Sequence, residues 1–154
     1  MLTQVEQAKE KWRGAHTAID HCLNERKQLL VQYCKLAGLP PFKRSAGALP
    51  DKQSIESFCE LLMDYISTGH FAMYDKITAE CAHNNSGQSE AANICSEISN
   101  LTDEALSFND SFAGIDLDQE LASFDQNLSN LGQNLELRFE LEDKLIQVLH
   151  TEHL

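Results

Sequence analysis

The sequence predicts an all-α protein, an antiparallel four-helix-bundle-like domain with two or three additional short helices. Apolar residues recur at helical spacing in several segments, and clusters of turn-forming residues separate those segments. No segment shows the alternation of apolar and polar residues that is typical of a half-buried strand. A chain of 154 residues is long enough to bury a sizeable core, so we expect a single domain over residues 1–154.

Short breaks separate the predicted helices. The helices are expected over residues 3–12, 15–37, 52–68, 70–81, 89–108 and 117–149. Gly38 and Gly69 end the second and third of these helices. Asp51 can cap the third, because its carboxylate can accept hydrogen bonds from the free N–H groups of the first turn. Residues 83–88 and 109–116 are expected to be loops.

The last helix carries a heptad-like apolar stripe with two charged residues in it. The stripe consists of Leu117, Leu121, Phe124, Leu128, Leu131, Leu135, Leu145 and Leu149. The same alternation of steps of four and three places Arg138 and Glu142 where the core should be. Charges in a core need partners, because burying a lone charge is costly.

Arg26 takes a similar position in the predicted helix 15–37, where the apolar residues around it are Ile19, Leu23, Leu30 and Tyr33. We therefore expect Arg26, Arg138 and Glu142 to meet between the two helices, with Tyr33 or Asp20 as further partners. Two interpretations remain open. The three residues form a satisfied polar network that fixes helix register, or they line a polar cavity that receives a ligand or partner.

The charge of the chain is strongly negative and unevenly distributed. The net charge is −12, yet residues 1–50 hold eight Lys and Arg against four Asp and Glu. Between Lys76 and Arg138 there is no Lys or Arg. Direct binding to nucleic acid is disfavoured, because phosphate recognition needs clustered Lys and Arg. The acidity suits either solubility alone or a basic protein partner.

The cysteines and the absence of a long apolar run indicate the compartment. The five cysteines (Cys22, Cys34, Cys59, Cys81 and Cys95) are an odd number without a CxxC pair, which favours reduced thiols. No apolar run of about 18 residues exists, so we expect no membrane span. The first residues are charged and lack the apolar core of a signal peptide, so a cytoplasmic protein is expected.

Enzyme and cofactor signatures are missing. The sequence has no nucleotide-binding or hydrolase motif. It has one Glu-x-x-His motif, Glu80 to His83, whereas a di-iron helical bundle needs two. His150 and His153 have ligand-like spacing near the end of the chain, where solvated histidines are the simpler interpretation. We therefore predict no catalytic residue, no metal and no cofactor. His70 keeps one alternative open, a histidine phosphotransfer module, against an ordinary histidine at a helix end.

Three segments, taken together, resemble the Rsd/AlgQ family, the regulators of sigma D. The order and spacing of short motifs carry the resemblance across nearly the whole chain. These motifs are Arg13-Gly14, Ile19-Asp20, Arg26, Leu29-Leu30-Val31, Leu36-Ala37-Gly38, Phe58-Cys59, Asp64-Tyr65, Gly69-His70-Phe71, Tyr74, Arg138-Phe139, Leu141-Glu142-Asp143 and Lys144-Leu145-Ile146. Residues 82–127 match poorly.

The resemblance implies a non-enzymatic, all-helical anti-sigma factor. Family members bind region 4 of the primary, housekeeping sigma factor, a basic helix-turn-helix module that reads the promoter −35 element and contacts core RNA polymerase. Binding there would compete with both core polymerase and promoter DNA and would lower housekeeping transcription in stationary phase. In the pseudomonad branch the family is also described as a positive regulator of virulence-related genes. The alternative is an adaptor on the same scaffold with another regulatory partner.

The resemblance also directs attention to one candidate surface. Asp64 lies in a family-like segment but opposite the apolar stripe of helix 52–68, beside Leu61, so packing does not explain it. We expect Asp64 to pair with a sigma-factor arginine, with a solvated aspartate as the alternative. Other members of the candidate surface are Glu60, His70, Phe71 and Tyr74.

Overall fold

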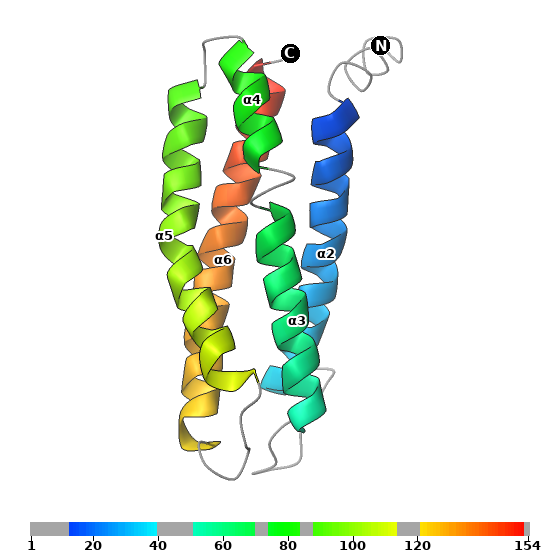
Figure 1. Ribbon diagram of the computed structural model, residues 1–154, viewed down its shortest axis with the longest axis vertical. Helices are drawn as coiled ribbons and strands as arrows, with labels where there is room; N and C mark the ends of the chain where they lie inside the picture. The colour runs from blue at the N-terminus through cyan, green and yellow to red at the C-terminus, as the bar shows by residue number, and fades with distance from the viewer. Residues whose placement is uncertain (1–12, 40–50, 70–73, 84–87, 114–120, 153–154) are drawn as a thin grey trace.

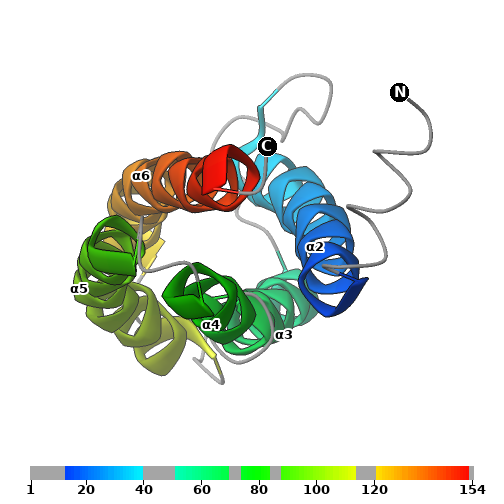
Figure 2. The same cartoon turned by 90° about the horizontal axis from the view of Figure 1, so that it is seen from above.

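The computed structural model describes residues 13–39, 51–69, 74–83, 88–113 and 121–152, and the regular elements that begin and end within these ranges are α-helices. The helices are α2 (Arg13–Ala37), α3 (Lys52–Thr68), α4 (Asp75–His83), α5 (Gln88–Phe112) and α6 (Leu121–Glu152). α4 stacks above α3 in one column, and α2, α5 and α6 form three more (Figure 1). Seen from above, the four columns surround a common core (Figure 2). The predicted all-α bundle is confirmed.

Local sequence signals fix the ends of α2 and α3. Gly38 adopts φ 68°, a conformation that glycine reaches without strain. Its N–H donates to the Lys35 carbonyl and that of Leu39 to the Cys34 carbonyl, which is the Schellman arrangement. At the start of α3, the Asp51 carboxylate accepts from the Ser54 N–H at 2.7 Å. Both predicted helix ends are therefore confirmed.

α5 is longer than the sequence predicted. The expected loop at residues 109–116 is wrong for residues 109–112, because α5 continues to Phe112. Phe112 and Phe124 meet edge to face with ring centroids 5.2 Å apart. This packing outweighs the weak helix propensity of the asparagine, aspartate and serine that precede Phe112. The rest of that loop and the predicted helix 3–12 lie outside the described residues.

α4 also begins later than expected. The helix predicted from His70 starts at Asp75, and residues 70–73 lie outside the described part of the chain. It runs to His83, two residues beyond the predicted end. The structure describes no side chain for Glu80 or His83, so the Glu-x-x-His motif stays a sequence observation.

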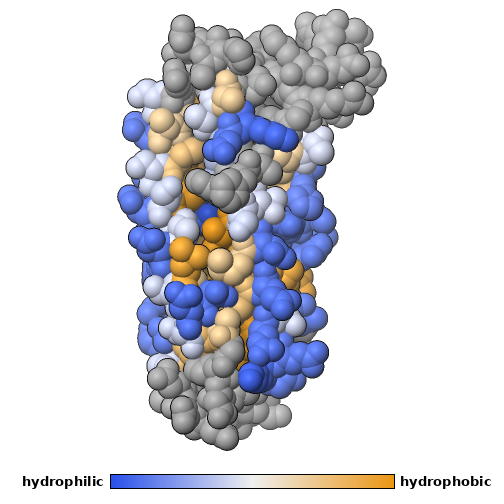
Figure 3. All heavy atoms as spheres, viewed as in Figure 1, coloured by the Kyte–Doolittle hydropathy of each residue, from blue (hydrophilic) through white to orange (hydrophobic). Residues whose placement is uncertain are grey.

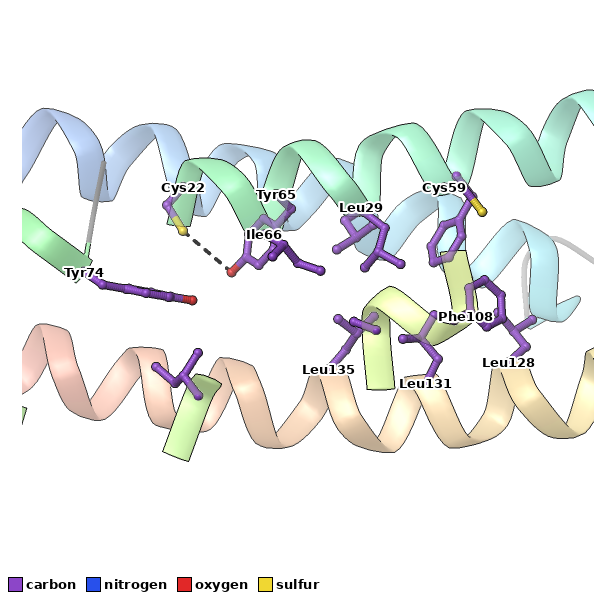
Figure 4. Close-up of a cluster of buried hydrophobic side chains, with 14 of the residues drawn as sticks. Cys22, Leu29, Cys59, Tyr65, Ile66, Tyr74, Phe108, Leu128, Leu131 and Leu135 are labelled. Atoms are coloured by element: carbon purple, nitrogen blue, oxygen red, sulfur yellow. Dashed lines mark hydrogen bonds between the residues drawn. The ribbon is translucent and has the colours of Figure 1, made fainter. Parts of the chain in front are cut away.

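One continuous hydrophobic cluster joins the described helices (Figure 4). The apolar stripe of α6 supplies five of its buried members, namely Phe124, Leu128, Leu131, Leu135 and Leu145. α3 contributes Ile55, Phe58, Cys59, Leu62, Tyr65 and Ile66. The core positions predicted for these helices are confirmed wherever the structure describes them. None of the described helices has a segment long and apolar enough to cross a membrane.

The buried face of α2 is rotated from the predicted one. Leu23 and Leu30, expected in the core around Arg26, are about two-fifths exposed at 39% and 41%. Cys22 and Leu29 are instead fully buried. At about 100° per residue, these two pairs lie on opposite sides of Arg26. Arg26 therefore marks the edge of the buried face and not its middle.

Candidate functional site

Glu142 of α6 lies at the centre of a buried polar cluster, with 0% of its surface exposed. One carboxylate oxygen, Oε1, accepts hydrogen bonds from the Tyr65 hydroxyl and, at 3.1 Å, from Nη2 of Arg26. The other, Oε2, accepts from the Tyr74 hydroxyl. We call Arg26, Tyr65, Tyr74, Arg138 and Glu142 the Glu142 cluster. A buried carboxylate with donors on both oxygens is a satisfied one.

Arg26 connects the Glu142 cluster to the surface of the bundle. Its Nη1 donates to Oδ1 of Asp143 at 2.8 Å, and its Nε donates to the Tyr65 hydroxyl at 3.3 Å. The guanidinium also lies over the Phe139 ring, 4.8 Å from the centroid. Burial opposes the charge, but the contacts with Tyr65, Asp143 and Glu142 outweigh it and raise the pKa of Arg26 above its usual value. Arg26 is therefore held as a cation.

Arg138 brings α5 into the same cluster. It is 1% exposed, and its Nε lies 3.6 Å from Oε2 of Glu142. Its Nη1 donates to Oγ1 of Thr102 at 3.1 Å, and that hydroxyl donates in turn to the Ile98 carbonyl. The partners of this carboxylate thus come from α2, α3, α6 and the residue directly before α4. Arg138 extends the network to Thr102 of α5.

The structure brings together Arg26, Arg138 and Glu142, the three charged residues singled out in the sequence. The further partners expected for them differ. Tyr33 is not one of them, because its hydroxyl donates to the Leu128 carbonyl at 2.9 Å. Asp20 is an exposed residue of α2, and its pairing with the cluster stays a prediction. Sequence reasoning missed the two tyrosines of the cluster. A tyrosine on a buried helix face was the available signal, because its hydroxyl needs a partner there.

The two tyrosines act as hydrogen-bond donors, and their hydroxyls turn toward each other (Figure 4). Burial, and next the Glu142 carboxylate, raise the pKa of Tyr65 and of Tyr74 well above the usual value. The Cys22 thiol lies 3.6 Å from the Tyr65 hydroxyl. Burial raises the pKa of the Cys22 thiol to about 11. Protonated groups of this kind stabilise a carboxylate but supply no nucleophile.

The sequence-predicted surface residues separate into three groups. Asp64 and Glu60 are exposed on α3. Leu61, expected to be exposed, is partly buried and packs against the core, because it lies at the flank of the apolar stripe. Tyr74 is 4% exposed and bonds inward to Glu142, so the expectation that it lines a surface is wrong. His70 and Phe71 lie outside the described residues.

Asp64 and Glu60 border a groove between α3 and α5, which we call the α3/α5 groove. It consists of two adjoining hollows that share Met63. From α3 it is lined by Glu56, Cys59, Glu60, Met63, Asp64, Ile66 and Ser67. From α5 it is lined by Ser99, Thr102, Asp103, Leu106 and Asn109, and Ala113, the residue that follows α5, completes the lining. Figure 3 shows a hydrophobic strip on this face, with hydrophilic side chains on both sides.

Among the residues that the structure describes, no three His, Cys, Asp or Glu side chains are grouped so as to hold a metal ion. The four cysteines whose side chains the structure describes are free thiols, two of them buried. The interior is thus occupied by packing and by the Glu142 cluster, and the outer surface offers an acidic groove. These features define a helical bundle suited to binding another protein.

Comparison with known proteins shows the family to which this helical bundle belongs. Residues 1–150 match the family described as "Regulator of RNA polymerase sigma(70) subunit, Rsd/AlgQ", and the chain belongs to this family. A "Regulator of sigma D" from Yersinia pseudotuberculosis is 37% identical over 149 residues, covering 96% of this chain and 88% of the relative. Another from Pectobacterium atrosepticum is 36% identical over 152 residues, covering 97% and 99%. The protein is a member of a family of sigma-factor regulators.

Proposed function

We propose that this protein is a cytoplasmic, non-enzymatic anti-sigma factor that binds region 4 of the primary sigma factor. Binding blocks the contacts of region 4 with core RNA polymerase and with the promoter −35 element, and so lowers housekeeping transcription in stationary phase. The observation that carries the proposal is the acidic surface around Asp64, on a chain that belongs to the family of sigma-factor regulators.

The chemistry of the two partners is complementary. A helix-turn-helix module presents Lys and Arg to DNA phosphates. A surface that offers carboxylates in place of phosphates can cover the same basic residues and exclude DNA from them. Asp64 and Glu60 are exposed acidic residues one helical turn apart on α3, so one basic helix can face both of them.

The Glu142 cluster supports this surface from inside. Tyr65 follows Asp64 directly and donates its hydroxyl to Glu142, so the buried contact fixes the register of α3 at the position of the proposed ion pair. A preorganised surface loses less conformational entropy when its partner binds. The proposal gives the cluster a structural role and does not depend on a small ligand in the core.

The test is titration calorimetry against isolated region 4 of the primary sigma factor from the same host, at two salt concentrations. We expect tight binding that weakens as salt is added, because exposed charge pairs are screened. Asp64→Asn should weaken binding and reduce its salt dependence. Glu97→Gln, which changes an exposed residue of α5 outside the α3/α5 groove, should leave the affinity and its salt dependence unchanged. Absence of binding at micromolar concentrations would overturn the proposed function.

A further inference from the structure

We propose that the α3/α5 groove binds an amphipathic α-helix with an apolar stripe and Lys or Arg on both sides of it. This inference rests on the proposed function, in which the helix belongs to region 4 of the sigma factor. It adds α5 to an interface that the sequence placed on α3 and the segment after it. It also assigns a binding role to Met63, Asp103 and Leu106, which were not expected from sequence patterns to lie at an interface.

The dimensions of the groove suit a helix. The two hollows enclose about 440 and 260 Å³ and lie end to end along α3 and α5. The lining of α3 runs from Glu56 to Ser67. At about 1.5 Å per residue this length is about 16 Å, which corresponds to three turns of a docked helix. On both walls the lining residues recur every three or four positions, so each wall is a single helix face.

The floor and the rim of the groove differ in chemistry. Buried or partly buried side chains of apolar or weakly polar character form the floor, namely Cys59, Met63, Ile66 and Leu106. Four carboxylates form the rim, three on α3 and one on α5, which are Glu56, Glu60, Asp64 and Asp103. Glu56 lies 3.9 Å from the Lys52 ammonium, which offsets part of its charge. No basic residue lines either hollow.

This pattern selects one kind of occupant. Carboxylates on both walls disfavour nucleic acid and acidic peptides. Small ligands prefer enclosed pockets, whereas these hollows are open along the surface. An amphipathic helix matches both parts of the groove, since its apolar stripe covers the floor while its basic flanks reach the two rims.

The α5 wall is held in place by the core. Thr102 lines the groove, and its hydroxyl accepts the hydrogen bond from Arg138 of the Glu142 cluster. Tyr65 anchors the α3 wall to the same cluster. Both walls are therefore fixed relative to α6, and the groove exists before a partner arrives.

The experiment compares two charge reversals on α5 in the calorimetric assay with region 4. Asp103→Lys places a cation on the rim, whereas Glu97→Lys makes the same change on an exposed residue that lines neither hollow. We expect Asp103→Lys to weaken binding about tenfold or more and Glu97→Lys to weaken it less than about threefold. Met63→Ala, a third variant, should weaken binding to a similar degree at both salt concentrations, because it removes apolar contact.

The outcomes separate the two proposals. If the unmodified protein binds region 4 and Asp103→Lys binds equally well, the groove is not the interface, while the proposed function stands. If Asp103→Lys and Glu97→Lys weaken the binding of region 4 equally, region 4 is attracted by the overall acidity of the protein. This outcome would also overturn the inference that the groove is the interface. If the unmodified protein does not bind region 4, the proposed function fails, and the inference about the groove fails with it. Circular dichroism of each variant verifies that the bundle is intact.

Discussion

Glu142 joins the other four residues of the Glu142 cluster. Its two oxygens accept from two tyrosines and one arginine, and a second arginine lies 3.6 Å away. The positive charge of Arg138 is 1% exposed, so its principal compensation is the Glu142 carboxylate. Removing a single carboxylate therefore leaves a buried cation and two buried hydroxyls without their acceptor.

We predict that Glu142→Ala lowers the free energy of unfolding by about 3–5 kcal/mol, because it leaves buried charge unpaired. Asp143→Asn is the matched control, since Asp143 pairs with the same Arg26 but its side chain is 62% exposed, and its cost should stay below about 1 kcal/mol. Urea denaturation of both variants measures the difference. Equal losses for the two would contradict the central role of Glu142.

At the scale of elements, α2 and α6 approach closely because of one glycine. A Cβ added at Gly132 would lie 2.2 Å from the Tyr33 hydroxyl oxygen and 2.8 Å from its Cζ atom. That hydroxyl donates to the Leu128 carbonyl, one turn earlier on α6. Gly132 thus makes room for the contact that joins the two helices.

We predict that Gly132→Ala destabilises the protein by about 1 kcal/mol. Overpacking costs about 1–3 kcal/mol, which exceeds the gain of up to about 1 kcal/mol in helix propensity. In a Tyr33→Leu background the same substitution should be neutral or stabilising, because the clashing hydroxyl and ring carbon are gone. Thermal denaturation of the four proteins completes the double-mutant cycle. A loss that persists in the Tyr33→Leu background would point to a different obstruction.

At the scale of the whole molecule, buried protonated groups make stability depend on pH. Burial raises the pKa of Cys22 and of Cys59 to about 11. Between the usual thiol pKa and this value, the unfolded chain releases protons that the folded chain retains. The free energy of unfolding is therefore highest below the usual thiol pKa and falls as pH rises toward 11. Tyr65 and Tyr74 add to this loss at still higher pH.

We predict a loss of about 1 kcal/mol per buried thiol between about pH 8 and about pH 10. Urea denaturation at the two pH values measures it. The double variant Cys22→Ala, Cys59→Ala should lose less stability over this interval than the unmodified protein, whatever its stability at pH 8. An identical pH dependence in both proteins would exclude the thiols as its source.

Periodicity predicted most of the fold, because the buried stripes of α3, α5 and α6 repeat at helical spacing. It also located Arg138 and Glu142, since a charge inside a strict heptad stripe stands out. It failed for the face of α2, where leucines occur on both sides of Arg26 and hydrophobicity alone cannot tell which side is buried. It failed for the end of α5 because Phe112 is held by Phe124, which is distant in sequence.

The candidate site was predictable only in part. An exposed Asp64 opposite an apolar stripe is visible in the sequence, but its neighbours across the α3/α5 groove are not. Asp103 and Leu106 follow from the pairing of α3 with α5, which sequence spacing does not encode. The inward orientation of Tyr74 was hidden for the same reason, since its acceptor lies 68 residues further along the chain.

The Glu142 cluster also bears on how the chain is made. Arg26 and Glu142 are 116 residues apart, so the ribosome synthesises the cation long before its carboxylate partner. Until α6 emerges, a nascent chain that has formed α2 and α3 cannot neutralise Arg26 or provide an acceptor for Tyr65 in this way. Completion of the core is therefore tied to α6, which is translated after α2 to α5. A chain cut short before residue 142 lacks the carboxylate that joins the other four residues of the Glu142 cluster.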